Sequence, residues 1–269
     1  MKKFEVLVSA LNNDPEQLIG RMNLGSDAVI INQTDHKDKR VVKLDNDCIV
    51  RIFENTDRGV GASRNKALSK AEAEIVLFSD EDIVYDKGCE KKILKAFEEN
   101  ADADIILFNI EVDERRRTYW IDKRTKVGRF NSGRYPAYSA AARLSSLKKT
   151  GVKFSLLFGG GAPYSNGEDS LFFMDCVRSG LKIVAVPVKI GKEEFRDSTW
   201  FKGYNEKFFF DRGVLYHFLY RGAAVIWGLR FVVIKSRVMC REVHMVKAFS
   251  LLCAGIRKGK KIDKNGGGR

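Results

Sequence analysis

Ile75-Val76-Leu77-Phe78-Ser79-Asp80-Glu81-Asp82 is the stretch that decides the fold of this chain. Its apolar half is short and bounded by polar residues, which is typical of a buried strand. Alternate residues of an extended chain point to the same side, so Asp80 and Asp82 are expected to lie together at the strand end. Two such carboxylates suit a hard divalent cation, Mg²⁺ or Mn²⁺, that keeps positions open for phosphate oxygens. An acidic turn after a strand would explain the same residues, so the surrounding sequence has to decide.

Length and composition allow one large core, or one core with an appendage. The chain has 269 residues, of which 44% are hydrophobic. The cysteines are Cys48, Cys89, Cys176, Cys240 and Cys253. Their odd number and lack of paired metal spacing indicate reduced thiols in a cytosolic compartment. The three histidines are far apart, which disfavours a histidine-based metal site. The N-terminus runs straight into a strand-like segment, which argues against a cleaved signal peptide.

The positive charge is concentrated near the C-terminus. The net charge is +13, and residues 221–269 contain twelve Lys/Arg and two acidic residues, a balance of +10. The first 220 residues therefore carry only +3. A nucleic-acid-binding chain would more often be basic along its length, so nucleic acid is not an expected partner. The pattern indicates a near-neutral domain followed by a basic segment.

Apolar runs alternate with helical patterns through the first two thirds of the chain. Strands are expected at residues 4–8, 28–31, 49–53, 75–78, 105–110 and 181–186. Helices are expected at residues 14–22, 61–70, 88–99 and 168–179. Asp14 and Pro15 are a good N-cap and first helical residue. This order predicts an α/β fold with a mostly parallel sheet and helices on both faces. Ligands of such sheets bind beyond the carboxyl ends of the strands.

Four polar elements recur at those carboxyl ends. They are Ser9-Ala10-Leu11-Asn12-Asn13, the segment from Arg58 to Asn65, the acidic strand end, and Glu168-Asp169. Their order and spacing resemble the family 2 nucleotide-sugar glycosyltransferases, which have the GT-A fold. The resemblance covers about residues 4–203, and its most specific part is Gly61-Ala62-Ser63-Arg64-Asn65-Lys66-Ala67-Leu68. Phe158-Gly-Gly-Gly-Ala162 and Ser198-Thr-Trp-Phe201 look like the bacterial branch that builds capsule, exopolysaccharide or lipopolysaccharide.

The resemblance implies a set of residues around the nucleotide-sugar donor. These are Ser9, Ala10, Asn12, Asn13, Asn32, Gln33, Gly59, Arg64 and Glu81. Asn32 and Gln33 stand where the family carries an Asp that reads the base, and their amides could still hydrogen-bond a uracil edge. Arg64 would lie beside the diphosphate, where its guanidinium fork favours bidentate contacts. The alternative for Arg64 is an exposed residue on a helix.

The resemblance also assigns the metal and the chemistry. Asp80 and Asp82 would hold Mn²⁺ or Mg²⁺, with Asp82 as the direct ligand, to neutralise the departing nucleoside diphosphate. Asp169 would be the catalytic base, with Glu168 on acceptor hydroxyls or orienting the helix. The alternative is that these two acids only cap a helix. One base without a recognisable second nucleophile implies direct displacement with inversion.

Trp200 and Lys202 follow a segment that lies near the acceptor and the leaving phosphates in similar enzymes. An aromatic face suits stacking on a sugar ring. An exposed tryptophan between domains is the alternative for Trp200.

The chain is expected to divide into a glycosyltransferase domain, residues 1–203, and a basic helical region, residues 204–269. The apolar runs 214–220 and 223–234 of that region are interrupted by Arg221 and Arg230, and the second is short for a membrane span. Such residues suit helices lying in an anionic membrane surface. A buried helix pair with a solvated basic face is the alternative. The expected location is cytoplasmic, peripheral to the inner face of the cell membrane.

The leading hypothesis is an inverting glycosyltransferase that uses a UDP-sugar and acts on a glycan or lipid-linked glycan in bacterial surface polysaccharide synthesis. A nucleotidyltransferase on a related fold would need a Gly-rich loop with Arg and Lys after the first strand, which Ser9 to Asn13 lacks. A basic, non-enzymatic membrane adaptor would leave the acidic strand end unexplained. A dehydrogenase is disfavoured because no Gly-x-Gly-x-x-Gly follows the first strand.

Overall fold

The computed structural model describes residues 2–114, 117, 119–194 and 203–266. The chain forms two compact units. The first comprises Met1–Phe154 and Phe172–Arg196, and the second comprises Ser155–Leu171 and Asp197–Arg269. The sequence predicted one boundary, after residue 203. The main difference is that residues 155–171 are grouped with the C-terminal helices.

The first unit alternates strands and helices in the predicted order. Its strands are β1 (Phe4–Leu11), β2 (Ala28–Gln33), β3 (Asp38–Lys43), β4 (Ile49–Asn55), β5 (Ile75–Asp80), β6 (Ile83–Tyr85), β7 (Ile105–Glu111), β8 (Thr125–Val127), β9 (Ala140–Arg143) and β10 (Ile183–Glu193). Its helices are α1 (Pro15–Arg21), α2 (Val60–Lys70), α3 (Cys89–Glu99), α4 (Leu144–Thr150) and the main part of α5 (Glu168–Arg178). The short 3₁₀ turns η1 (Ser132–Arg134) and η2 (Ala137–Ser139) precede β9.

The start of α1 shows how local sequence sets an element. Asp14 has an extended backbone, and its carboxylate accepts a hydrogen bond from the Glu16 amide at 3.0 Å. Pro15 takes the first helical position, where its missing N–H has no partner to lose. The predicted N-cap and first residue of this helix are confirmed.

The strands of the first unit form one mixed sheet in the order β3-β4-β2-β1-β5-β9-β7-β10-β6, with β8 on β10. The central strands β4, β2, β1 and β5 are parallel, with Val6 opposite Ala28 on one side and Leu77 on the other. β3 and β9 run antiparallel to their neighbours. This is the predicted α/β class, with a parallel centre and antiparallel additions at the flanks.

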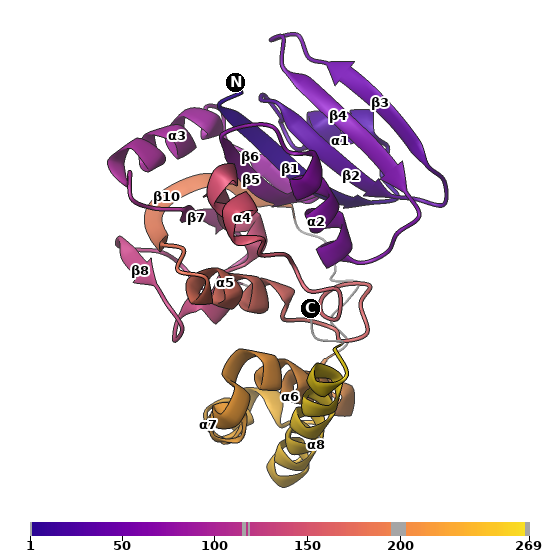
Figure 1. Ribbon diagram of the computed structural model, residues 1–269, viewed down its shortest axis with the longest axis vertical. Coiled ribbons are helices and arrows are strands. Elements are labelled where there is room, and N and C mark those ends of the chain that lie inside the picture. Colours follow the sequence, from indigo (N-terminus) through magenta and orange to yellow (C-terminus); the bar gives the residue numbers. More distant parts are fainter. Residues whose placement is uncertain (1, 115–116, 118, 195–202, 267–269) are drawn as a thin grey trace. The chain divides into compact units, whose positions relative to one another are not determined.

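Side chains of β1 alternate between two cores, one on each face of the sheet. Phe4, Val6 and Val8 pack on one face with residues of α1 and α3. Leu7 packs on the other face with residues of α2, α4 and α5. Figure 1 shows these helices against the sheet. β1, β2 and β5 are buried on both faces, which explains why they read as almost continuous apolar runs.

The second unit is built on the helices α6 (Glu206–Tyr220), α7 (Ala224–Met239) and α8 (Met245–Lys264), with the turn η3 (Arg221–Ala223) between the first two. α6 and α8 approach so closely that their backbones touch. A Cβ atom on Gly213 would overlap the carbonyl oxygen of Leu252, and one on Gly255 would overlap that of Phe210. Glycine at these two positions is therefore a packing requirement, and α6 and α8 together form the core of this unit.

The apolar runs 214–220 and 223–234 belong to one helical stretch, Glu206–Met239. By length and composition this stretch of 34 residues could cross a membrane, although a core helix of a soluble protein passes the same test. One third of its most apolar window is buried inside the protein. The buried part includes α6, which packs on α8.

Candidate active site

The acidic residues follow β5 at the centre of the sheet. β5 pairs in parallel with β1, and Ser9 lies opposite Asp80 in their register. β2 and β4 end at the same edge, because they are parallel to β1. The loops that follow β1, β2, β4 and β5 therefore converge, as the sequence predicts, and they place the acidic strand end among them.

Arg64 of α2 is bound to Asp80. Its Nη2 donates to both carboxylate oxygens, at 2.8 and 3.1 Å, and its guanidinium lies over the ring of Phe154. Only 2% of Arg64 is exposed. A guanidinium this deep needs a carboxylate partner to offset its lost hydration. Arg64 therefore orients Asp80 in this structure and is not the exposed helix residue of the alternative. Its place beside the diphosphate stays a prediction.

Asp82 is a largely buried carboxylate that pairs with no cation among the described residues. Burial raises its pKa to about 7, and the negative charges of Asp80 and Glu193 add to this rise. No ion pair within the described part of the chain involves Asp82. Glu193 comes from the end of β10, which pairs with β6 so that Glu193 lies opposite Ile83. An acidic group raised in pKa by burial and like charge would gain strongly from a bound cation.

The acidic strand end fits an open metal site. Within the described residues, no group of three or more His, Cys, Asp or Glu side chains is arranged to enclose a metal ion. Mg²⁺ is commonly held by one or two carboxylates, with water and substrate phosphates completing its coordination. Asp82, with Asp80 beside it, matches that donor set.

Glu81 fastens the end of β1 to the end of β5. Its Oε2 accepts hydrogen bonds from the Leu11 amide and from Nδ2 of Asn13, both at 2.6 Å. Arg21 adds a bond from Nη2 to Oδ1 of Asn13 at 2.9 Å. Asn12 lies between Leu11 and Asn13 and has a positive φ of 51°. Its backbone amide donates to the carbonyl of Gln33 at 3.0 Å. The predicted donor residues Asn13 and Glu81 are thus used here to shape the loop.

Asn32 and Gln33 also hold loops. The buried amide of Asn32 donates to the carbonyl of Asn13 at 2.7 Å and to Glu54 at 3.0 Å. Its oxygen accepts from the Asn13 amide at 3.2 Å. The side-chain oxygen of Gln33 accepts from the amide of Gly59 at 2.8 Å. The side chain of Asn32 is buried and fully hydrogen-bonded in this way, so it does not present an edge to a nucleobase, which corrects the base contact predicted for Asn32. For Gln33 the base contact stays a prediction, with the side-chain oxygen held by Gly59.

Ser9 and Ala10 lie within β1 and not in the loop after it. Both are buried, and Ala10 packs in the core with α1 and α3. The chain stays extended to Leu11 because each residue from Val6 to Leu11 pairs with β2. The predicted loop therefore begins only at Asn12, and contact of Ser9 and Ala10 with the nucleoside is not supported by their positions.

Glu168 and Asp169 are the first residues of α5, and both belong to the second unit. Gly167 before them has a φ of 112°, and a side chain there would overlap Leu215. The preceding loop is tied to α6, because the amide and the hydroxyl of Ser165 both donate to the buried Asp211 at 3.0 Å. The acids therefore follow a loop of fixed backbone, and negative charge at a helix start is favourable.

Trp200 and Lys202 lie outside the described residues.

Two side chains near Asp80 and Asp82, those of Glu193 and Tyr138, were not predicted. Glu193 was missed because β10 was expected to stop at Val186, before Pro187, and proline is uncommon inside a strand. Tyr138 lies among Tyr119, Glu193, Asp80 and Asp82, and its pKa is raised above the ordinary value mainly by burial. No sequence pattern marks Tyr138.

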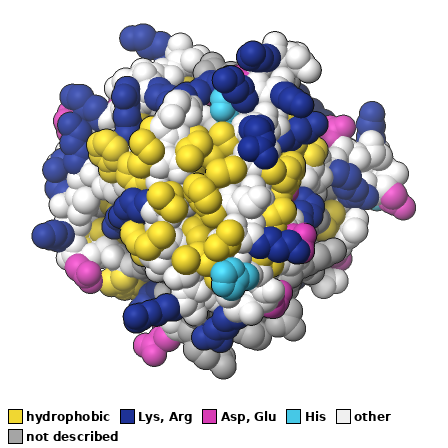
Figure 2. All heavy atoms as spheres, turned by 90° about the horizontal axis from the view of Figure 1, so that it is seen from below, with side chains coloured by type: hydrophobic (Ala, Val, Ile, Leu, Met, Phe, Trp, Pro, Cys, Tyr) yellow, Lys and Arg dark blue, Asp and Glu magenta, His cyan; other side chains and the backbone are white. Residues whose placement is uncertain are grey.

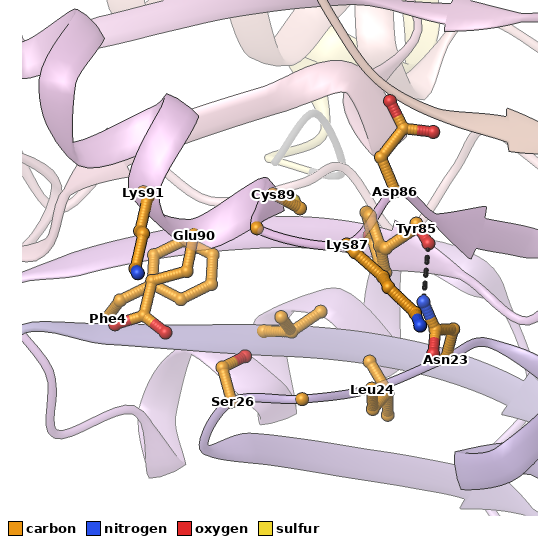
Figure 3. Close-up of a pocket in the computed structure, with 13 residues that line it drawn as sticks. Phe4, Asn23, Leu24, Ser26, Tyr85, Asp86, Lys87, Cys89, Glu90 and Lys91 are labelled. Carbon is orange, nitrogen blue, oxygen red and sulfur yellow. Dashed lines mark hydrogen bonds between the residues drawn. The ribbon is translucent and has the colours of Figure 1, made fainter.

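A cavity of the first unit lies at the other edge of the sheet, where β1 begins (Figure 3). Phe4, Leu24, Tyr85 and Cys89 line it, and Nδ2 of Asn23 donates to the carbonyl of Tyr85 at 2.9 Å. Burial raises the pKa of Cys89 to about 12, which keeps the thiol protonated. None of the predicted donor, metal or catalytic residues lines this cavity.

Comparison with known proteins decides the family. Residues 16–155, just over half of the chain, match the model of the glycosyl transferase family 2. The chain belongs to glycosyl transferase family 2. No match was found among curated protein sequences. The family membership and the fold together support a transferase, in agreement with the resemblance seen in the sequence.

Solved glycosyltransferase structures share the fold of this family 2 chain. S. aureus TarS 1–349 in complex with UDP-GlcNAc aligns with a TM-score of 0.60 and 16% identity, covering 98% of this chain and 92% of that chain. The mannosyltransferase PcManGT from Pyrobaculum calidifontis, in complex with GDP-Man and Mn²⁺, aligns with a TM-score of 0.52 and 14% identity, covering 96% and 75%. At these identities the likeness concerns the fold alone.

The raised pKa of Asp82 predicts a pH-dependent stability. The folded-state pKa of about 7 lies above the ordinary 3.8, so the fold favours the protonated carboxyl. That stabilisation is complete below about pH 4 and is lost as the pH rises through 7. We expect Asp82→Asn to raise the free energy of unfolding of the metal-free protein by roughly 2 to 4 kcal/mol above pH 7, with a smaller gain at pH 5.

Denaturant unfolding of the metal-free protein at several pH values measures this effect. The control Asp45→Asn makes the same change of charge at an exposed position away from the site. The free energy of unfolding of this control should not rise relative to the unsubstituted protein as the pH increases. An Asp82→Asn variant no more stable than the unsubstituted protein at any pH would contradict the assigned environment.

Proposed function

We propose that this chain is an inverting glycosyltransferase that moves a sugar from a UDP-sugar to a hydroxyl of a glycan or lipid-linked glycan in bacterial surface polysaccharide synthesis. The observation that carries the proposal is the carboxylate pair after β5. Asp80 is held by Arg64, and Asp82 lies beside it with no ion pair to any residue that the structure describes. Family membership supports sugar transfer over the nucleotidyltransferase alternative.

The proposed donor is a nucleotide-sugar bound together with Mn²⁺ or Mg²⁺. The similar structures support this class, since TarS was solved in complex with UDP-GlcNAc and PcManGT in complex with GDP-Man and Mn²⁺. Asp82, with Asp80 beside it, would hold the metal. When bound there, the metal would neutralise the charge that develops on the leaving nucleoside diphosphate. Arg64 would keep Asp80 in place, because its two bonds to that carboxylate fix the rotamer.

The chemistry proposed for the protein is a single displacement. Asp169 takes the proton of the acceptor hydroxyl as that oxygen forms its bond to the anomeric carbon. The bond from the same carbon to the diphosphate oxygen breaks, and its electron pair leaves with the nucleoside diphosphate. One displacement inverts the configuration at the anomeric carbon. Glu168, the neighbouring acid at the start of α5, is the second candidate for the base.

The first test concerns the metal-dependent donor site. Asp82→Asn removes the charge of the proposed direct ligand, so we expect UDP to bind at least tenfold more weakly in the presence of Mn²⁺. Isothermal calorimetry of UDP with and without Mn²⁺ measures this, and Asp45→Asn is the control of equal charge change. Unchanged Mn²⁺-dependent affinity of the Asp82→Asn variant would rule out this ligand.

The second test concerns the base. Water can stand in for the acceptor, so UDP release from a panel of UDP-sugars with Mn²⁺ present and absent reports turnover without a known acceptor. We expect Asp169→Asn to keep UDP-sugar binding and to lose turnover on the order of a hundredfold or more, because general base catalysis is lost. The matched variant Glu168→Gln should lose less. A larger loss of turnover in Glu168→Gln than in Asp169→Asn would assign the role of base to Glu168. If no UDP-sugar releases UDP, the result would count against the proposed donor class.

A further inference from the structure

α7 has an apolar face that the described residues of the second unit leave exposed. This face, called the α7 face below, consists of Val225, Ile226, Leu229, Val233, Ile234 and Val238. Exposure is 72% for Ile226 and 54% for Val233. Figure 2 shows apolar side chains gathered on one side of the molecule, with lysine and arginine side chains around them. A continuous apolar patch on a surface helix is unusual in a protein that meets only water.

The opposite side of α7 is fixed by packing inside the second unit. Ala224, Gly228 and Val232 are buried along one line of the helix. A Cβ atom on Gly228 would overlap the side chain of Leu252 in α8, and Val232 shares a core cluster with Leu252. The helix can therefore not rotate its apolar face inward. Apolar residues on both sides of one helix indicate that the second side has a partner outside this unit.

The charges around the α7 face identify the kind of partner. α7 carries Arg230, Lys235 and Arg237 and has no acidic residue. Arg230 lies over the ring of Trp227, which stacks on Tyr220 with 4.8 Å between ring centres. The side chains of arginine and tryptophan each combine an apolar part with a polar or charged group. Such side chains suit the boundary between lipid headgroups and acyl chains. The segment 221–269 as a whole carries +10.

We propose that the α7 face lies in the headgroup region of an anionic membrane. Its apolar side chains would enter the boundary of the acyl chains, and its basic residues would meet the lipid phosphates. The same chemistry would bring the enzyme to the inner face of the cell membrane, where lipid-linked acceptors are found. This inference does not depend on the identity of the donor or of the base.

The helix lies along the membrane and does not cross it. α6, the other half of the apolar stretch, is committed to the protein core through its glycine contacts with α8. The two halves are separated at Arg221, whose backbone is left-handed and whose guanidinium pairs with Asp263. A second copy of the chain is a poor occupant, because it would bring two strongly positive segments together.

Vesicle co-sedimentation of the full-length chain tests the proposal. We expect binding to vesicles of phosphatidylglycerol with phosphatidylcholine, and binding on the order of tenfold weaker to phosphatidylcholine alone or at high salt. The double variant Ile226→Glu/Val233→Glu should lose binding on the order of tenfold or more, because it places two acids on the α7 face. Both positions are exposed, so the variant should fold, as circular dichroism would verify.

Val41→Glu in β3 is the matched control. Val41 is also an exposed valine, at 59%, but lies in the first unit, so its acidic variant should bind vesicles as the unsubstituted chain does. Equal binding of the double variant and the unsubstituted chain would overturn the proposal, as would no binding to either kind of vesicle. Light scattering adds one more outcome: a dimer that the double variant converts to monomer would assign the α7 face to a second copy and also overturn it.

Discussion

The ion pair of Arg64 with Asp80 is the interaction on which the site depends. It joins the first turns of α2 to the carboxyl end of β5, and it does so with a guanidinium that is almost fully buried. Breaking such a pair from one side leaves an uncompensated charge, which is among the costliest changes a core can undergo. The pair therefore fixes where the acidic strand end lies, and among the described residues Asp82 has no cation as a partner.

A polar network around that pair holds the strand ends in register. Glu81 binds the end of β1, and Asn32 binds the loop that follows β1 and also Glu54 at the end of β4. The side chain of Gln33 holds the loop before α2 through the amide of Gly59. Buried polar groups that are satisfied in this way rigidify the backbone around them. A rigid strand edge is what a site needs to bind a diphosphate and a metal without rearrangement.

The sequence predicted the frame of the protein better than the roles of its polar residues. The apolar runs identified β1, β2, β5 and β7, because strands buried on both faces are apolar almost throughout. The shorter run Ile49–Phe53 identified β4, which is buried on one face. Their ends were placed too early where polar residues continue the strand, as at Ser9 and Gln33, since pairing with neighbours and not side-chain type keeps them extended. The strands β6, β8 and β9 are short, and β3 is mostly polar and exposed, so these four were not predicted.

Partners of polar side chains are equally hidden in a sequence. Spacing places Arg64 near the acidic strand end, but it does not tell whether the guanidinium binds a carboxylate or a phosphate. Asn32 appears as an available amide until its three hydrogen bonds are seen. The exposed side of α7 is a similar case, because only the packing of Gly228 and Val232 reveals which apolar residues remain uncovered.

We propose Asp82 as the open metal ligand of the donor site, beside Asp80, which Arg64 holds. A crystal structure of the protein with UDP and Mn²⁺, with the metal located by its anomalous scattering, tests it most directly. We expect manganese bound directly to the carboxylate of Asp82 and to the diphosphate, with Arg64 still bound to Asp80. Manganese at another set of residues, or UDP bound with Arg64 on its phosphates and no metal at Asp82, would contradict it.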